Sequence, residues 1–136
     1  MSSPQFILDT DILSLLMRKN AAVVAKASAY LSEHRQFTIS IVTRYEILRG
    51  LKAKGAHQQA SRFEEFCAGN RVLSITDDVV LRAADIYADL YRRGELIGDA
   101  DILIAASALA NGCGIVTNNE EHFRRVTGLR VDNWLR

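Results

Sequence analysis

Oxygen-bearing side chains stand at several points of the sequence where a strand is expected to end or a helix to begin. Asp9 directly follows a short apolar, strand-like segment, and Asn119 comes just after another one. Asp99 and Asp101 stand at the start of an alanine-rich helical segment. Glu46 lies about one turn inside an expected helix, where its side chain can point back toward the start of that helix.

These five polar groups predict a site for a hard divalent cation. Carboxylates that converge raise each other's pKa and repel one another unless a cation offsets their charge. Oxygen-only ligands favour Mg²⁺ or Mn²⁺ over zinc. In a phosphodiesterase, such an ion would orient and deprotonate a water molecule and would offset charge on the leaving oxygen.

Each residue also has a purely structural interpretation. Asp9 can cap a helix instead of binding a metal, and one of Asp99 and Asp101 can do the same. Glu46 can form an ion pair on its own helix, with Arg49 or Arg44 as partner, and Asn119 can be a turn residue. Spacing alone leaves these alternatives open.

Strand-like and helix-like segments alternate along the chain. Strands are expected at residues 5–8, 37–41, 71–75, 114–117 and 129–131. Helices are expected from the capping residues 9–11 onward, at 21–34, 42–54, 56–68, 77–93 and 101–110, and once more before the last strand. This order predicts an α/β fold, a three-layer α/β/α sandwich with a mainly parallel central sheet of four to five strands. In such sheets ligands bind beyond the carboxyl ends of the strands, which is where the acids are expected.

Length and composition predict one globular domain spanning residues 1–136. Of the 136 residues, 49% are hydrophobic, 24% are charged and only one is proline. The net charge of +1 gives no global attraction to nucleic acid, so any RNA contact must be local. Cys67 and Cys113 have no CxxC spacing and are expected to be buried free thiols. We see neither a signal peptide nor a membrane span, and we expect a soluble cytoplasmic protein.

Other catalytic chemistries find no support in the sequence. His34, His57 and His122 occur singly, and surface positions are expected for them. No serine stands in a GxSxG context, and neither GxGxxG nor GxxxxGK[ST] occurs.

Four short motifs, taken in order, resemble those of the PIN-domain ribonucleases, and the VapC toxins of VapBC toxin–antitoxin pairs are the most similar group. The motifs are FILDTD at 6–11, YEILRG at 45–50, IGDADILIAA at 97–106 and VTNN at 116–119. The resemblance covers essentially the whole chain, as far as the tail at 126–134.

The resemblance places three acidic metal ligands on Asp9, Glu46 and Asp101, with Asp99 as an additional acid beside the third. Thr10 and Thr117 match hydroxyl residues that help to hold the site by hydrogen bonding.

The chain departs from the family pattern at three points. Asn119 stands where many PIN domains carry Asp, and Asp11 replaces an Asn that is common there. The acid that relatives often place immediately before Phe123 is also missing, so Glu120 or Glu121 is a candidate to complete the site.

The resemblance implies a Mg²⁺-dependent endoribonuclease, with Mn²⁺ as a substitute ion, that cleaves RNA and frequently tRNA. It also implies a homodimer, a VapB-like antitoxin that blocks the site, and promoter DNA bound only through the antitoxin complex. Basic residues near the expected site are candidates for contacting RNA phosphates. They are Arg44, Arg49, Lys52, Lys54, Arg92 and Arg93.

Two other functions remain open at this point. One is a non-catalytic PIN-like binding module with a degenerate acidic cluster, an option that Asn119 keeps open. The other is a structure-specific DNA nuclease, which the short chain makes a weaker hypothesis because such enzymes use extra helical insertions to thread DNA.

Overall fold

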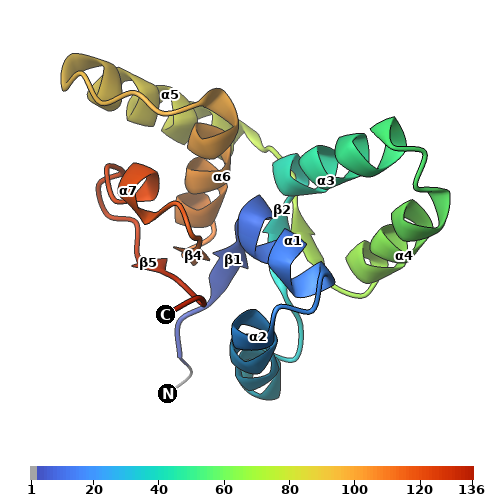
Figure 1. Ribbon diagram of the computed structural model, residues 1–136. Coiled ribbons are helices and arrows are strands. Elements are labelled where there is room, and N and C mark those ends of the chain that lie inside the picture. The colour runs from blue at the N-terminus through green and yellow to red at the C-terminus, as the bar shows by residue number, and fades with distance from the viewer. Residues whose placement is uncertain (1–2) are drawn as a thin grey trace.

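The computed structural model describes residues 3–136 of the chain, and within this span five strands form one entirely parallel sheet. The strands are β1 (Phe6–Leu8), β2 (Thr38–Ser40), β3 (Arg71–Leu73), β4 (Gly114–Val116) and β5 (Val131–Asp132). Their spatial order is β3-β2-β1-β4-β5. The chain therefore moves outward from β1 to β3 and then crosses back to the other side of β1 (Figure 1).

Seven helices connect these strands within the described residues. They are α1 (Thr10–Met17), α2 (Ala21–His34), α3 (Ile41–Ala53), α4 (His57–Ala68), α5 (Asp77–Arg92), α6 (Asp99–Ala110) and α7 (Glu120–Phe123). Several begin at residues with strong capping chemistry. The side chains of Asn20, Ser40 and Thr76 accept a hydrogen bond from an otherwise unpaired backbone N–H at the start of α2, α3 and α5.

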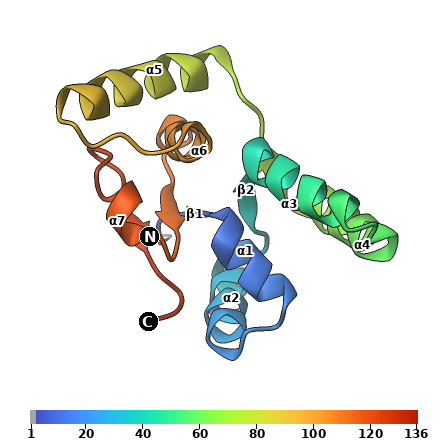
Figure 2. The ribbon, with the colours of Figure 1, turned by 45° about the horizontal axis from the view of Figure 1, so that its top comes forward.

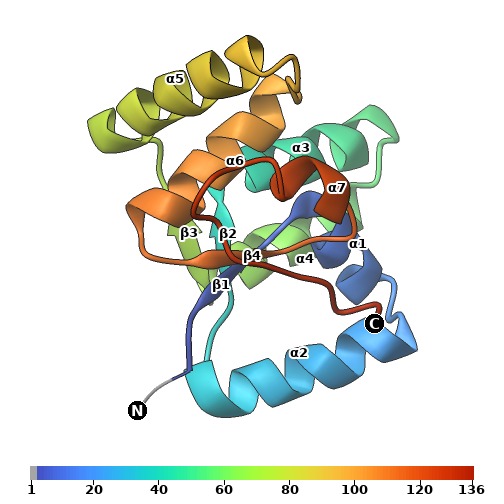
Figure 3. The same cartoon turned by 90° about the vertical axis from the view of Figure 1, so that its left-hand side faces the viewer.

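The helices pack on both faces of the sheet, and successive strand residues point to opposite faces. Ile7 and Ile115 belong to a core shared with α5, α6 and α7. Their neighbours Leu8 and Val116 belong to a second core shared with α1, α2, α3 and α4. Figures 2 and 3 show the sheet between these two groups of helices, with α5 and α2 on opposite outer sides. The prediction of a three-layer α/β/α sandwich is confirmed, and its sheet has five strands.

The central strands are held at close range by a glycine. In β4, Gly114 pairs with Phe6 of β1, and a Cβ atom at this position would come within 2.5 Å of the Phe6 ring and 2.9 Å of the Arg130 carbonyl oxygen. A larger residue would push β1, β4 and the last segment of the chain apart. The close pairing matters because Asp9 and Thr117 lie just beyond the carboxyl ends of β1 and β4.

The structure differs from the sequence prediction mainly at element ends. Helix α6 begins at Asp99 rather than Asp101, because Gly98 occupies the capping position, and β5 covers residues 131–132 rather than 129–131. Cys67 and Cys113 are buried free thiols, as predicted. Among residues 3–136 no helix is long and apolar enough to cross a membrane.

Candidate metal centre

Asp9 lies just beyond the carboxyl end of β1, at the point between β1 and β4 where the winding order of the parallel strands reverses. Its backbone N–H extends the sheet by donating to the Val116 carbonyl at 2.9 Å, and its side chain caps α1. One carboxylate oxygen, Oδ1, accepts the Thr10 N–H at 2.8 Å, and the other, Oδ2, accepts the Thr117 hydroxyl at 2.8 Å. Only 6% of Asp9 is exposed. Both of its oxygens are therefore held in fixed positions at the switch point of an α/β sheet, the usual place for a ligand.

Thr117 links Asp9 to the segment that follows β4. Its fully buried hydroxyl donates to Asp9 and accepts the Asn119 N–H at 2.9 Å. The loop after β4 is thereby fixed relative to the carboxylate.

The electrostatic environment of Asp9 disfavours a negative charge. Burial, strengthened by the nearby Asp11 carboxylate and to a smaller extent by Asp101, raises the pKa of Asp9 to about 7. The hydrogen bonds from Thr117 and Thr10 oppose this rise. Burial also raises the pKa of Asp11, whose carboxylate accepts the Asn118 N–H at 3.1 Å and the Ile12 N–H at 2.7 Å. A cation beside Asp9 would remove this penalty.

Glu46 is oriented toward the site by Thr10. The Thr10 hydroxyl donates to Glu46 Oε1 at 2.6 Å, and the Thr43 hydroxyl lies 3.1 Å from that of Thr10. The second oxygen of Glu46 lies 3.8 Å from the Arg49 guanidinium, and the side chain is 21% exposed. Glu46 therefore forms an ion pair on its own helix, as its structural interpretation expects. It is also linked to Asp9 through Thr10.

Asp101 approaches from the first turn of α6 and meets α7. Its Oδ2 lies 3.6 Å from His122 Nδ1, which in turn lies 2.8 Å from the side-chain nitrogen of Asn119. Burial raises the pKa of Asp101, the nearby Glu46 adds to that rise, and the contact with His122 opposes it. Asp101 thus lies within electrostatic range of both Glu46 and Asp9.

The sequence prediction missed His122 and Asp11. His122 is expected at the surface, and its side chain is 40% exposed, but the sequence did not predict its contact with Asp101. The signal was its spacing from Asn119, since residues three apart on a helical turn face the same side. For Asp11 the signal was its position at the start of a helix, two residues after Asp9.

Asp99 stands apart from this cluster. It is exposed at the first position of α6, and its side chain forms no hydrogen bond or ion pair with any residue of 3–136. The backbone of Gly98, rather than either acid, occupies the capping position. Glu120 is also turned elsewhere, because it accepts hydrogen bonds from Asn133, Arg124 and Arg136. Glu121 pairs with Arg125 at 3.5 Å.

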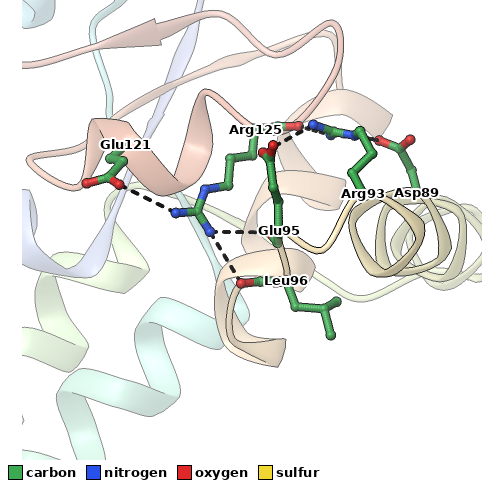
Figure 4. A network of polar contacts seen from close by, with 6 residues as sticks. All are labelled: Asp89, Arg93, Glu95, Leu96, Glu121 and Arg125. Carbon is green, nitrogen blue, oxygen red and sulfur yellow. Dashed lines mark hydrogen bonds and ion pairs between the residues drawn. The ribbon is translucent and has the colours of Figure 1, made fainter.

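A polar network fixes the loop that leads into α6. Figure 4 shows Arg93 paired with Asp89 and Glu95, and Arg125 directed at the carbonyl oxygens of Glu95 and Leu96. Arg93 also donates to the carbonyl of Arg125. These contacts join the loop before α6 to Arg125, just after α7. Helix α6 carries Asp101, and α7 carries His122.

The other basic candidates have different environments. Arg44 forms a bidentate ion pair with Glu64, with a shortest N–O distance of 2.7 Å. Arg49 lies over the ring of Tyr45 and beside Glu46. Lys52 and Lys54 are exposed and form no ion pair with residues 3–136, and the same holds for Arg92.

The donor set suits a Mg²⁺ ion that keeps several of its waters better than an ion enclosed entirely by protein side chains. Within residues 3–136 no three Asp, Glu, His or Cys side chains are close enough to surround one ion by themselves. Mg²⁺ usually keeps several waters and takes only one or two carboxylates directly. The oxygen donors and the unfavourable charge at buried Asp9 match this mode of binding.

Comparisons with known proteins show which family the chain belongs to. Residues 6–129 match the PIN domain family. The chain is 31% identical to the tRNA(fMet)-specific endonuclease VapC of Shigella flexneri, over 96% of this chain and 98% of that protein.

Solved structures give the same answer. DNA-bound VapBC from Salmonella typhimurium contains a chain with a TM-score of 0.84 and 27% identity, covering 97% of this chain and 99% of that one. VapBC2 from Rickettsia felis, bound to a promoter DNA fragment, gives a TM-score of 0.84 and 25% identity, covering 95% and 98%. The chain therefore belongs to the PIN-domain family and, within it, to the VapC ribonucleases of VapBC toxin–antitoxin systems.

Proposed function

We propose that this protein is a Mg²⁺-dependent endoribonuclease that acts as the toxin of a toxin–antitoxin pair. The observation that carries the proposal is the buried Asp9 carboxylate, held by Thr10 and Thr117 and lying within electrostatic range of Asp11 and Asp101. A buried carboxylate whose pKa is raised to about 7 at the carboxyl edge of a parallel sheet is a typical feature of a functional site. The ribonuclease relatives supply the substrate class.

In this proposal Asp9, Glu46 and Asp101 hold a hydrated ion, one or two of them directly and the rest through its bound waters, and Asp99 lies outside this set. The bound ion would supply an activated water and would offset negative charge on the phosphodiester. The chain's own hydroxyl groups keep the ligands in place: Thr117 fixes Asp9, and Thr10 fixes Glu46. Hydrogen bonds of this kind are a common way of orienting metal ligands.

Asn119 and His122 form the remaining side of the site. Asn119 has a carbonyl oxygen that can accept a hydrogen bond from a bound water, and it brings no negative charge. His122 stands between Asn119 and Asp101 and is exposed enough to contact a substrate. This side of the site is thus less acidic than the Asp9 side.

The proposed substrate is RNA, and tRNA is the first class to test because the Shigella flexneri relative is a tRNA(fMet)-specific endonuclease. We also propose a VapB-like antitoxin as partner, with promoter DNA bound through the complex. Support comes from the two VapBC structures with DNA.

A homodimer is the proposed assembly. Large apolar side chains are exposed along α5, where Val80, Leu81, Tyr87 and Tyr91 are 45–64% accessible. Light scattering after gel filtration would give the molar mass of the protein in solution and so test the dimer.

Cleavage of a labelled tRNA transcript in a Mg²⁺ titration tests the enzymatic proposal. We expect discrete products that appear with Mg²⁺ or Mn²⁺ and disappear with EDTA. The rival function is a non-catalytic binding module, an option that the neutral Asn119 keeps open. Such a module would bind RNA or a partner without any EDTA-sensitive product.

A further inference from the structure

A groove of about 810 Å³ lies between α1, α3 and α4, next to the candidate metal centre. These three helices are neighbours in Figure 1. Thr10 and Glu46, which belong to the metal centre, also line the groove. A ligand bound in the groove would therefore reach the candidate metal centre.

Four cations line this groove and lack acidic partners. They are Arg18, Lys19, Lys54 and Arg62, contributed by the end of α1, the end of α3 and the middle of α4. None of them forms an ion pair in the described part of the chain. By contrast, Arg44 and Arg93 are paired with acids at 2.7 and 2.8 Å. Among residues 3–136, Glu46 at the metal centre is the only acidic side chain that lines the groove.

Helix ends explain only part of this charge. Arg18 and Lys54 are the C-terminal capping residues of α1 and α3, where a cation complements the helix dipole. Arg62 lies in the middle of α4, far from either end, so the dipole gives no reason for a cation there. Three helices thus direct unpaired positive charge into one groove.

The groove also has an apolar floor. Leu51 and Phe66 are partly buried and line it, and Phe66 stacks on the buried Phe63 with ring centroids 6.1 Å apart. Single-stranded nucleic acid matches both features, because its phosphate backbone binds cations and its bases pack on apolar or aromatic surfaces.

We propose that this groove holds single-stranded RNA next to the phosphodiester that is cleaved. Arg18, Lys19, Lys54 and Arg62 contact the backbone phosphates, and the apolar floor accepts a base. The inference rests on the proposed function, because it assumes that the metal centre acts on RNA. It adds a binding path for the RNA and names four residues for it, all of which lie outside the motif segments of the sequence.

The test is the binding of a fluorescein-labelled, unstructured oligoribonucleotide of about 12 nucleotides, a length within the usual range of single-strand sites. Anisotropy is measured in EDTA, so that cleavage does not interfere, at several KCl concentrations. The groove variant is Lys54→Ala with Arg62→Ala. The matched control is Lys26→Ala with Arg35→Ala, which removes the same charge at the exposed face and the end of α2.

We expect the groove variant to bind RNA about tenfold more weakly, and the salt slope to fall by about 1.4, since each lost phosphate contact on a single strand contributes about 0.7. The control should bind within about twofold of the wild type, because its cations lie outside the groove. Both variants should keep the thermal unfolding midpoint of the wild type.

Equal losses in both variants would overturn the proposal, because charge would then act without regard to position. Unchanged RNA binding by the groove variant would overturn it as well. If that variant instead lost its complex with a co-expressed antitoxin, the groove would be a protein-docking site.

Cleavage by the wild-type protein is measured in parallel. Metal-dependent products combined with groove-insensitive binding would reject only the groove. Groove-dependent binding without any products would support the groove and reject the nuclease.

Discussion

The Thr117 hydroxyl donates a hydrogen bond of 2.8 Å to Asp9 Oδ2 across 108 residues of sequence. The two residues meet because β1 and β4 are parallel neighbours, with Leu8 in register with Val116. The bond fixes the orientation of the most buried acid of the site. It also connects that acid to Asn119, whose N–H donates to the same hydroxyl.

Replacing this hydroxyl tests its role. Thr117→Val keeps the shape of the side chain but leaves a carboxylate oxygen and the Asn119 N–H without a partner. We expect a loss of about 1–3 kcal/mol in the free energy of unfolding, measured in urea. RNA cleavage should fall about 10- to 100-fold, as for other residues that orient metal ligands. Thr117→Ser, which keeps the hydroxyl, should retain most of both properties; equal effects of Val and Ser would contradict the hydrogen-bonding role.

The pKa of Asp9 predicts an unusual dependence of stability on pH. The carboxyl titrates near 3.8 when unfolded and at about 7 when folded, so between these values the folded state binds the extra proton. The stability that this proton gives is complete below about pH 4 and is lost as the pH rises through about 7. Without metal, the wild type should lose about 2–4 kcal/mol over this range relative to Asp9→Asn, which does not titrate.

Urea unfolding in EDTA at a series of pH values checks this difference. Mg²⁺ should restore part of the lost stability of the wild type above pH 7 and none in Asp9→Asn, because the carboxylate is its binding group. Parallel stability curves for the two proteins would show that Asp9 titrates normally.

Thr10 is predicted to act through Glu46. Thr10→Val removes the donor that lies 2.6 Å from Glu46 Oε1, leaving Glu46 free to turn toward Arg49. We expect Mg²⁺ affinity, measured by calorimetry, to weaken about 10-fold or more. Thr10→Ser should bind the ion nearly as well as the wild type. Unchanged affinity in Thr10→Val would mean that Glu46 is oriented by other contacts.

The arginine network at the entrance to α6 should limit local opening. Arg125→Ala removes the side-chain contacts with the carbonyl oxygens of Glu95 and Leu96 and the ion pair with Glu121 (Figure 4). We expect faster amide hydrogen exchange in residues 94–98 and a loss of about 1 kcal/mol in stability.

Arg82→Ala is the control, because Arg82 forms a solvent-exposed ion pair with Asp78 within α5. It should change stability by less than about 0.5 kcal/mol. Equal exchange rates at 94–98 in both variants would exclude a bracing role for Arg125.

Much of the fold could be predicted from the alternation of strand-like and helix-like segments. The same reasoning placed Asp9 and Asn119 at one edge of the sheet, because residues that follow parallel strands gather there, whereas Thr117 was predicted only from the family resemblance. Asp99 and His122 differ from the sequence prediction, and each difference has a physical cause. Asp99 lies outside the cluster, because Gly98 caps α6 and Asp99, the first residue of the helix, is exposed. His122 lies beside Asp101 because of how α7 is placed against α6, and this is a tertiary contact that has no sequence signal beyond its spacing from Asn119.

The central claim is that the acidic cluster cleaves RNA with the help of a metal ion, and the most direct test compares wild type, Asp101→Asn and Asp85→Asn on one labelled tRNA substrate. Asp85 is an exposed acid on α5 and serves as the matched control. We predict Mg²⁺-dependent products from the wild type and from Asp85→Asn, and none from Asp101→Asn at an unchanged unfolding midpoint. Full cleavage by folded Asp101→Asn, or products that persist in EDTA, would contradict the account.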